Sequence, residues 1–235
     1  MYNKNKYAHT FYIELCLIKQ DRRLKMAVRP AWSVSEKGRI LKENFKFEFN
    51  PGFSPTQKKK NVKALHEAIG HKALEVSTKS NDNLGLMLSA FKLKLDGKTF
   101  ENVFQASKKY ENGGPFTDLL CVTPKEAKKA ERHHSSGKLI SFVYNGEEFK
   151  LEPKTFFYDF MYIKAVQQTI SKEDIQKILT YEYFTDIEFN PQKSINCQAK
   201  SVAIIKAILM KFGYIPDLNK EDFSAFYSTI KANLV

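Results

Sequence analysis

The chain has 235 residues, of which 43% are apolar and 13% aromatic, so it can bury one sizeable hydrophobic core. This composition excludes a wholly disordered chain, and no apolar run approaches the roughly 18 residues that a membrane span requires. The three cysteines, Cys16, Cys121 and Cys197, are widely spaced and odd in number, which fits neither a disulfide framework nor a zinc site. We therefore expect reduced thiols and a soluble, cytoplasmic protein with no membrane partner.

The positive charge is concentrated near the N-terminus. The net charge is +12; residues 1–60 hold 14 Lys/Arg against 5 Asp/Glu, a net of +9, and the remaining 175 residues hold 24 against 21, a net of +3. This charge fits a polyanion such as a nucleic acid. It fits a solvated basic arm equally well, so charge alone identifies no partner.

Residues 1–25 differ in character from the rest. Their apolar stretch over 11–18 is interrupted by Glu14 and followed at once by charged residues, which excludes a signal peptide. Met26 then begins the run MAVRPAW, which resembles the start of a separate polypeptide. We predict that residues 1–25 are a non-native or upstream extension and that residues 26–235 form a single domain.

The first elements of this domain are a strand and a helix. Three Phe at period two share one face of a strand predicted over residues 45–49. Ser54 is suited to cap the following helix, because Pro55 fits its first turn and apolar residues recur at helical spacing up to Ile69.

Two dipeptides favour tight hairpin turns. Asp96-Gly97 ends an alternating stretch over residues 88–95, which predicts a strand. Asn145-Gly146 lies between strands predicted over 139–144 and 147–151.

The remaining chain is mostly helical. A helix is expected to begin near Thr99 and to end before Gly113, since two Gly followed by Pro cannot continue it. Residues 154–168 are apolar round much of the helix circumference, which predicts a buried central helix. Further helices are expected at three capping positions: Ser171, Ser194 and either Asn219 or Asp217. The fold class is therefore α+β: a mostly α-helical single domain with a few short strands and hairpins.

The candidate chemistry lies in carboxylates, amides and lysines. There is no phosphate-binding Gly-rich loop, no nucleophile elbow and no His/Cys cluster, so neither a metal nor a cofactor is expected. On the helix predicted from Thr99, Glu101, Gln105 and Lys108 fall at i, i+4 and i+7. Such a stripe fits a pocket for a polar ligand, although the same spacing is more often that of a solvated helix face.

Two further segments carry polar groups. Asp186 and Glu188 are two apart and would share one face of a strand, where they fit ribose hydroxyls or glycosidic cleavage as well as ordinary loop polarity. The loop over residues 77–85, together with Gly113-Gly114, offers backbone N–H groups to a phosphate.

These segments together resemble the NADAR (YbiA-like) family. The run GKTFENVFQASKKY resembles its Glu-x-x-Phe-Gln-Ala-x-Lys helix. The fuller pattern resembles the branch paired with DarT-type DNA ADP-ribosyltransferase toxins, over roughly residues 45–212. Its segments are, in chain order, STKSNDNLG, ENVFQASK, GGPFTDLL, EPKTFFYDF and FTDIEFNPQKSINCQA. Ala90, where the family has Asn, and Asn196-Cys197, where other members have Gly-rich turns, depart from the pattern.

The resemblance implies a NADAR-like domain acting as an N-glycosidase. Its substrate would be ADP-ribose on guanine bases of single-stranded DNA, and its role that of an antitoxin to a DarT-type toxin. Two alternatives stay open. One is a binding module that sequesters ADP-ribosylated DNA or the toxin, and the other is an N-glycosidase for a small N-ribosylated metabolite.

The resemblance also implies residue roles. Glu101 would be the principal acid/base, with Lys108 as its electrostatic partner or as an amine that traps the opened sugar as an imine. Asp186 and Glu188 would hold ribose hydroxyls or assist protonation. The expected ligand-binding residues are Ser77, Lys79, Gln105, Gly114, Asp159, Asn190 and Asn196.

Overall fold

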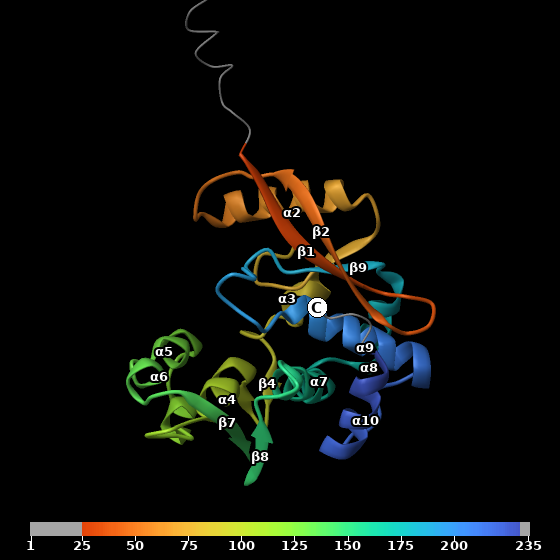
Figure 1. Cartoon of the computed structure of the whole chain (residues 1–235). Helices are drawn as coiled ribbons and strands as arrows, with labels where there is room; N and C mark the ends of the chain where they lie inside the picture. Colours follow the sequence, from red (N-terminus) through yellow and green to blue (C-terminus); the bar gives the residue numbers. More distant parts are fainter. Residues whose placement is uncertain (1–24, 231–235) are drawn as a thin grey trace, which may run out of the picture.

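The computed structural model describes residues 25–230. The extension predicted for residues 1–25 therefore falls, apart from Lys25, outside the described residues. Strands β1 (Met26–Val34) and β2 (Ile40–Glu48) form a long antiparallel hairpin, seen at the top of Figure 1. β1 also pairs with β9 (Tyr183–Thr185), which pairs in parallel with β3 (Ala73–Glu75). The sheet order β2-β1-β9-β3 thus brings a late strand beside two early ones.

Helix α2 (Pro55–Ile69) packs on the N-terminal hairpin (Figure 1). The Ser54 side chain accepts a hydrogen bond from the Gln57 backbone N–H at 3.2 Å, so the predicted cap is confirmed. Phe47 of β2 and Leu65 of α2 are buried in a small hydrophobic cluster between the two elements. This cluster explains the period-two Phe pattern of the strand.

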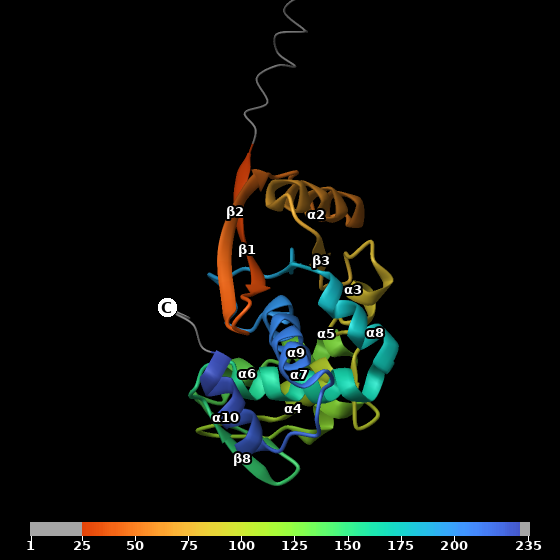
Figure 2. The ribbon, with the colours of Figure 1, turned by 90° about the vertical axis from the view of Figure 1, so that its right-hand side faces the viewer.

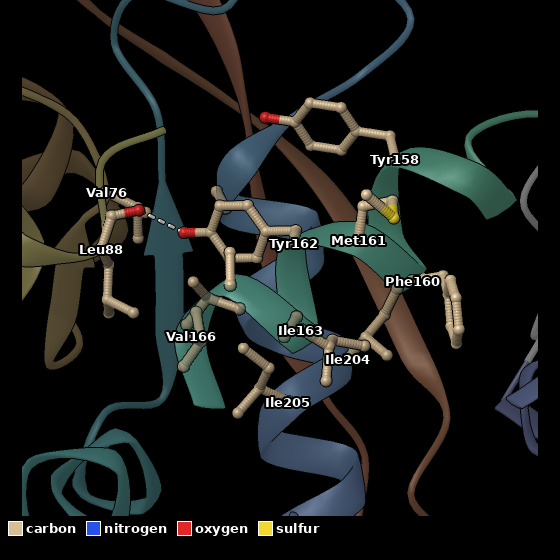
Figure 3. Close-up of a cluster of buried hydrophobic side chains, with 14 of the residues drawn as sticks. Val76, Leu88, Tyr158, Phe160, Met161, Tyr162, Ile163, Val166, Ile204 and Ile205 are labelled. Atoms are coloured by element: carbon tan, nitrogen blue, oxygen red, sulfur yellow. Dashed lines mark hydrogen bonds between the residues drawn. The ribbon is translucent and has the colours of Figure 1, made fainter. Parts of the chain in front are cut away.

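Two long helices form the centre of the molecule. α7 (Phe156–Thr169) and α9 (Gln198–Phe212) contact each other in the main hydrophobic core (Figures 2 and 3). Short helix α8 (Lys172–Lys177) follows α7. The last helix described, α10 (Lys220–Ile230), packs its buried side chains into the same core. Most of α7 is buried, which confirms the predicted central helix.

Two of the three predicted later caps are confirmed. Ser171 accepts the Asp174 backbone N–H at 3.1 Å, and Asn219 accepts that of Asp222 at 2.7 Å. Ser194 does not cap α9: the helix begins at Gln198, and the Ser194 hydroxyl donates to the Asn196 carbonyl inside the preceding loop.

Both predicted hairpin turns are present. β4 (Lys94–Leu95) and β5 (Lys98–Thr99) flank Asp96-Gly97, whereas β7 (Leu139–Tyr144) and β8 (Glu147–Lys150) flank Asn145-Gly146. All four turn residues have positive φ, as such tight turns require. The strand predicted over 88–95 is mostly wrong, since the N–H groups of Lys92 and Leu93 bond back to the Ser89 carbonyl and form turns.

The remaining helices are short: α3 (Asn83–Met87), α4 (Phe100–Ala106), α5 (Pro124–Lys129) and α6 (Arg132–Ser135), with 3-10 turns at Thr117–Cys121 and Ile178–Thr180. The helix predicted to run from Thr99 towards Gly113 ends early, at Ala106. The N–H groups of Phe116 and Val143 bond to the carbonyls of Ala106 and Ser107, at 2.8 and 2.7 Å. The chain then continues as strand β6 (Lys108–Tyr110), which pairs with β7.

The described part of the chain confirms the predicted α+β class: helices exceed strands there, and three small sheets lie around one main core. Among residues 25–230, no helix has the length and apolar character needed to cross a membrane.

Candidate active site

A cleft of about 1350 Å³ opens between the loops that follow β3, α3 and β9, helices α4 and α5, strand β6 and the start of α7. Pockets for drug-sized ligands usually measure about 300–1,000 Å³, so this cleft has room for a nucleotide conjugate. Eight of the eleven candidate residues line it: Ser77, Lys79, Glu101, Gln105, Lys108, Asp186, Glu188 and Asn196.

Glu101 and Gln105 lie on the cleft side of α4. They are one helical turn apart, whereas Phe100 and Phe104 pack into the main core. Gln105 Nε2 donates to Glu101 Oε1 at 2.9 Å, and the two residues are only 4% and 5% exposed. Gln105 Oε1 is buried and has no hydrogen-bond partner within the described residues. A buried acceptor without a partner is unusual in a folded protein.

Lys108 reaches the cleft from β6 and not from a helix, contrary to the predicted i+7 position. The pairing of β6 with β7 fixes its direction, and its ammonium lies 5.5 Å from the centre of the Phe104 ring. Burial lowers the pKa of Lys108 to about 8; the charge of Lys128 acts in the same direction and that of Glu101 against it. A lysine with such a pKa is partly an uncharged amine near neutral pH.

Asp186 lies just after β9, in a turn instead of the predicted strand: its Oδ1 accepts the Glu188 N–H at 3.1 Å. Gln198 Nε2 donates to its Oδ2 at 3.1 Å, while Gln198 Oε1 accepts the Ala90 N–H at 2.6 Å. Burial and the nearby charge of Glu75 raise the pKa of Asp186 to about 7, against these hydrogen bonds. Asp186 can therefore carry a proton near neutral pH.

A second buried carboxylate supports this turn from behind. Glu75 accepts hydrogen bonds from the Ser77 hydroxyl at 2.6 Å, the Thr185 hydroxyl at 2.7 Å and the Ile187 N–H at 2.9 Å. Burial raises the pKa of Glu75, although these hydrogen bonds oppose the shift. Ser77 thus lines the cleft with its hydroxyl committed to Glu75, which orients the turn that carries Asp186.

The rim of the cleft is basic. Glu188 lies there half exposed, 3.3 Å from Lys58, and Asn196 lines the cleft from the same loop, between β9 and α9. Six lysines, named here the lysine rim, line the cleft without an ion pair to any described carboxylate: Lys79, Lys125, Lys128, Lys150, Lys154 and Lys193. Lys128 also lies 5.6 Å from the centre of the partly exposed Phe91 ring. Unpaired cations beside an aromatic ring suit a polyanion that carries bases.

Gly114 and Asn190 do not line the cleft. Gly114 has φ +83°, and a Cβ there would come within 2.3 Å of the Lys108 carbonyl oxygen, so glycine lets this loop pack against β6. The Asn190 side chain accepts the Gln192 N–H at 3.0 Å within its own loop.

Asp159 also lies outside the cleft lining, in the buried interface between α7 and α9. Lys200 Nζ lies 2.8 Å from Asp159 Oδ2, and Ser201 donates to Oδ1 at 2.7 Å. Thr155 and Tyr227 donate to the same carboxylate at 2.8 and 3.1 Å. Its partners are therefore other side chains of the core.

A comparison of the whole sequence with models of protein families finds a match. The family model described as NADAR-DarT1, a DarT1-associated NADAR antitoxin, matches residues 27–234. The chain belongs to this family. The resemblance to the DarT-associated NADAR branch is thereby confirmed. Among curated proteins, the comparison finds no match.

Sequence reasoning missed three residues of this NADAR protein. Tyr158 lines the cleft and Gln198 holds Asp186, whereas Glu75 supports the Asp186 turn. Tyr158 and Gln198 lie in segments that resembled the family, but an almost wholly apolar helix gave no signal that Tyr158 faces a cleft. Glu75 follows two apolar residues in a short buried strand. An acidic residue is unusual in such a strand, and this was the one signal in the sequence that could have indicated its role.

The NADAR cleft offers no metal site: nowhere in residues 25–230 do three His, Cys, Asp or Glu side chains come together in a group that could hold an ion.

Proposed function

We propose that this NADAR protein is an N-glycosidase that removes ADP-ribose from guanine bases of single-stranded DNA and so reverses the action of a DarT1 toxin. The observation that carries the proposal is the meeting of Glu101, Asp186 and Lys108 in one large cleft. The family description supports the antitoxin role.

Cleavage of a ribosyl C–N bond makes two electrostatic demands. Positive charge develops at the anomeric carbon, and negative charge develops on the departing base. Glu101 is suited to stabilise the sugar cation and to position water, because Gln105 holds one carboxylate oxygen in place. Asp186, with a pKa of about 7, is suited to protonate the base.

Lys108 is suited to act as an amine. At pH 7 a group with a pKa of about 8 is uncharged in about one tenth of molecules, far more than an ordinary lysine. Its nitrogen would attack the anomeric carbon once the ribose ring has opened, the base nitrogen would leave with a proton, and water would hydrolyse the resulting imine.

Lys108→Arg keeps the positive charge but removes the amine. We expect this variant to lose at least about 100-fold in rate, because a guanidinium does not deprotonate and cannot form an imine. The wild-type rate should peak between about pH 7 and 8, falling below as Lys108 is protonated and above as Asp186 loses its proton. Borohydride should trap an ADP-ribosyl adduct on the wild type only, by mass spectrometry. A Lys108→Arg variant with near-wild-type rate would leave Lys108 only an electrostatic role.

The lysine rim supports a polynucleotide as the carrier of the ADP-ribose. A diphosphate alone has few charges, whereas six unpaired lysines around one opening match the repeated phosphates of a strand. The Phe91 ring beside Lys128 adds a surface on which a base can stack.

The proposal is tested by incubating ADP-ribosylated single-stranded DNA with the protein and measuring free ADP-ribose. We expect release, with a kcat/KM that exceeds that for ADP-ribosylated guanosine and falls steeply with added salt on DNA only. Tight binding without release would instead identify a binding module. Equal activity on DNA and nucleoside, with no salt dependence, would identify an enzyme for small N-ribosylated metabolites.

A further inference from the structure

Tyr158 is a buried tyrosine whose hydroxyl has no partner. It lies in the first turn of α7, is 6% exposed and lines the cleft, yet within the described residues its hydroxyl makes no hydrogen bond. One helical turn later, Tyr162 is buried in the same way, but its hydroxyl donates to the Leu88 carbonyl. Figure 3 shows both side chains, with the dashed line from Tyr162 alone. The Tyr158 hydroxyl is accessible from the cleft, so an acceptor group of a ligand can meet it there.

The Tyr158 ring is held rigidly. Phe100 and Phe104 meet it edge to face, with ring centres 5.2 and 5.1 Å away, and Tyr162 stacks beside it at 6.1 Å. The hydroxyl position is therefore set by packing and requires no ligand to order it.

The electrostatic surroundings make this hydroxyl a hydrogen-bond donor. Burial, together with the charges of Glu101 and Asp186, raises the pKa of Tyr158 well above its ordinary value. The hydroxyl therefore keeps its proton at physiological pH and lies within electrostatic reach of both carboxylates.

A ligand group that accepts the Tyr158 hydrogen bond lies within the electrostatic reach of Glu101 and Asp186. A phosphate fits poorly there, because carboxylates repel a negatively charged group. A sugar hydroxyl is uncharged, accepts from Tyr158 and can itself donate to a carboxylate. We propose that the Tyr158 hydroxyl donates a hydrogen bond to a hydroxyl of the ribose at the bond to be cleaved. Tyr158 is thus a specificity residue for the ribosyl group, an inference that rests on the proposed function.

The test compares the binding of ADP-ribose and ADP by calorimetry. The two probes share adenosine and diphosphate, and only ADP-ribose has the second ribose. We expect the wild type to bind ADP-ribose more tightly than ADP. In Tyr158→Phe the ratio of the two affinities should fall about tenfold, with ADP binding unchanged, since one hydrogen bond is lost. Because ADP-ribose carries no guanine, such a fall also separates a ribose contact from a base contact.

Tyr162→Phe is the matched control on the same helix. It should keep the affinity ratio but lower Tm by about 2–4 °C, because the buried Leu88 carbonyl loses its donor. Tyr158→Phe should keep the wild-type Tm, since its hydroxyl bonds to no described residue. A full affinity ratio in Tyr158→Phe would overturn this inference alone. A wild type that shows no preference for ADP-ribose over ADP would instead count against the proposed glycosidase site.

Discussion

Glu101→Gln is expected to slow the release of ADP-ribose from ADP-ribosylated single-stranded DNA by about 10²–10⁴-fold. The amide keeps the shape of the side chain and can still meet Gln105, but it can neither take a proton from water nor stabilise a sugar cation by its charge. The loss should fall on kcat, with little change in binding, because these functions are needed chiefly in the transition state. Single-turnover release on saturating substrate measures it directly.

The control for this variant is Glu131→Gln, which makes the same chemical change on an exposed residue outside the cleft lining. It should release ADP-ribose at the wild-type rate. Both variants should unfold at the wild-type temperature, so that a fall in rate reports chemistry. Wild-type release by Glu101→Gln would refute the assignment of Glu101 as the principal acid/base.

Lys200→Met is expected to destabilise the fold by about 3–5 kcal/mol. The Lys200–Asp159 pair is almost fully buried, and removal of the ammonium leaves the Asp159 carboxylate charged among apolar side chains of α7 and α9. The remaining hydroxyl donors, Ser201 and Tyr227 among them, carry no compensating charge. Urea-induced unfolding, followed by circular dichroism, measures the change in the free energy of unfolding.

Lys164→Met provides the comparison, on the same helix α7 but at the surface. Lys164 lies 3.5 Å from Asp217, whose side chain is 96% exposed, so water screens this pair. We expect a loss below about 1 kcal/mol. Similar small losses in both variants would mean that the buried pair contributes little, and that Asp159 finds enough stabilisation from hydroxyl groups.

Much of the local structure could be predicted because it depends on residues a few positions apart. The Ser54 and Asn219 caps, the turns at Asp96-Gly97 and Asn145-Gly146 and the buried helix α7 all follow from such short-range rules. The pairing of Glu101 with Gln105 belongs to the same class, since residues at i and i+4 are neighbours on any helix.

The errors occur where distant segments meet. Helical spacing predicts Lys108 on the same helix as Glu101. Hydrogen bonds from the Phe116 and Val143 N–H groups end that helix at Ala106, so Lys108 lies in strand β6. Ser194 was predicted as a cap from its side chain alone, whereas the loop before α9 extends to Cys197. The sequence of one segment does not show which of its carbonyls will accept hydrogen bonds from a strand or loop far away along the chain.

The sequence by itself determined the α+β class, most of the helices and turns, and the family. Periodicity, capping residues and the order of motifs can all be recognised from neighbouring residues, without knowledge of tertiary contacts. Only the tertiary structure decided that Glu101, Lys108 and Asp186 share a cleft, that Asp159 is paired with Lys200, and that Tyr158 presents an unpartnered hydroxyl. Burial and long-range charge also set the pKa of Lys108 to about 8 and that of Asp186 to about 7. Those quantities depend on what surrounds a side chain in space, and the surroundings come from elements far apart in sequence.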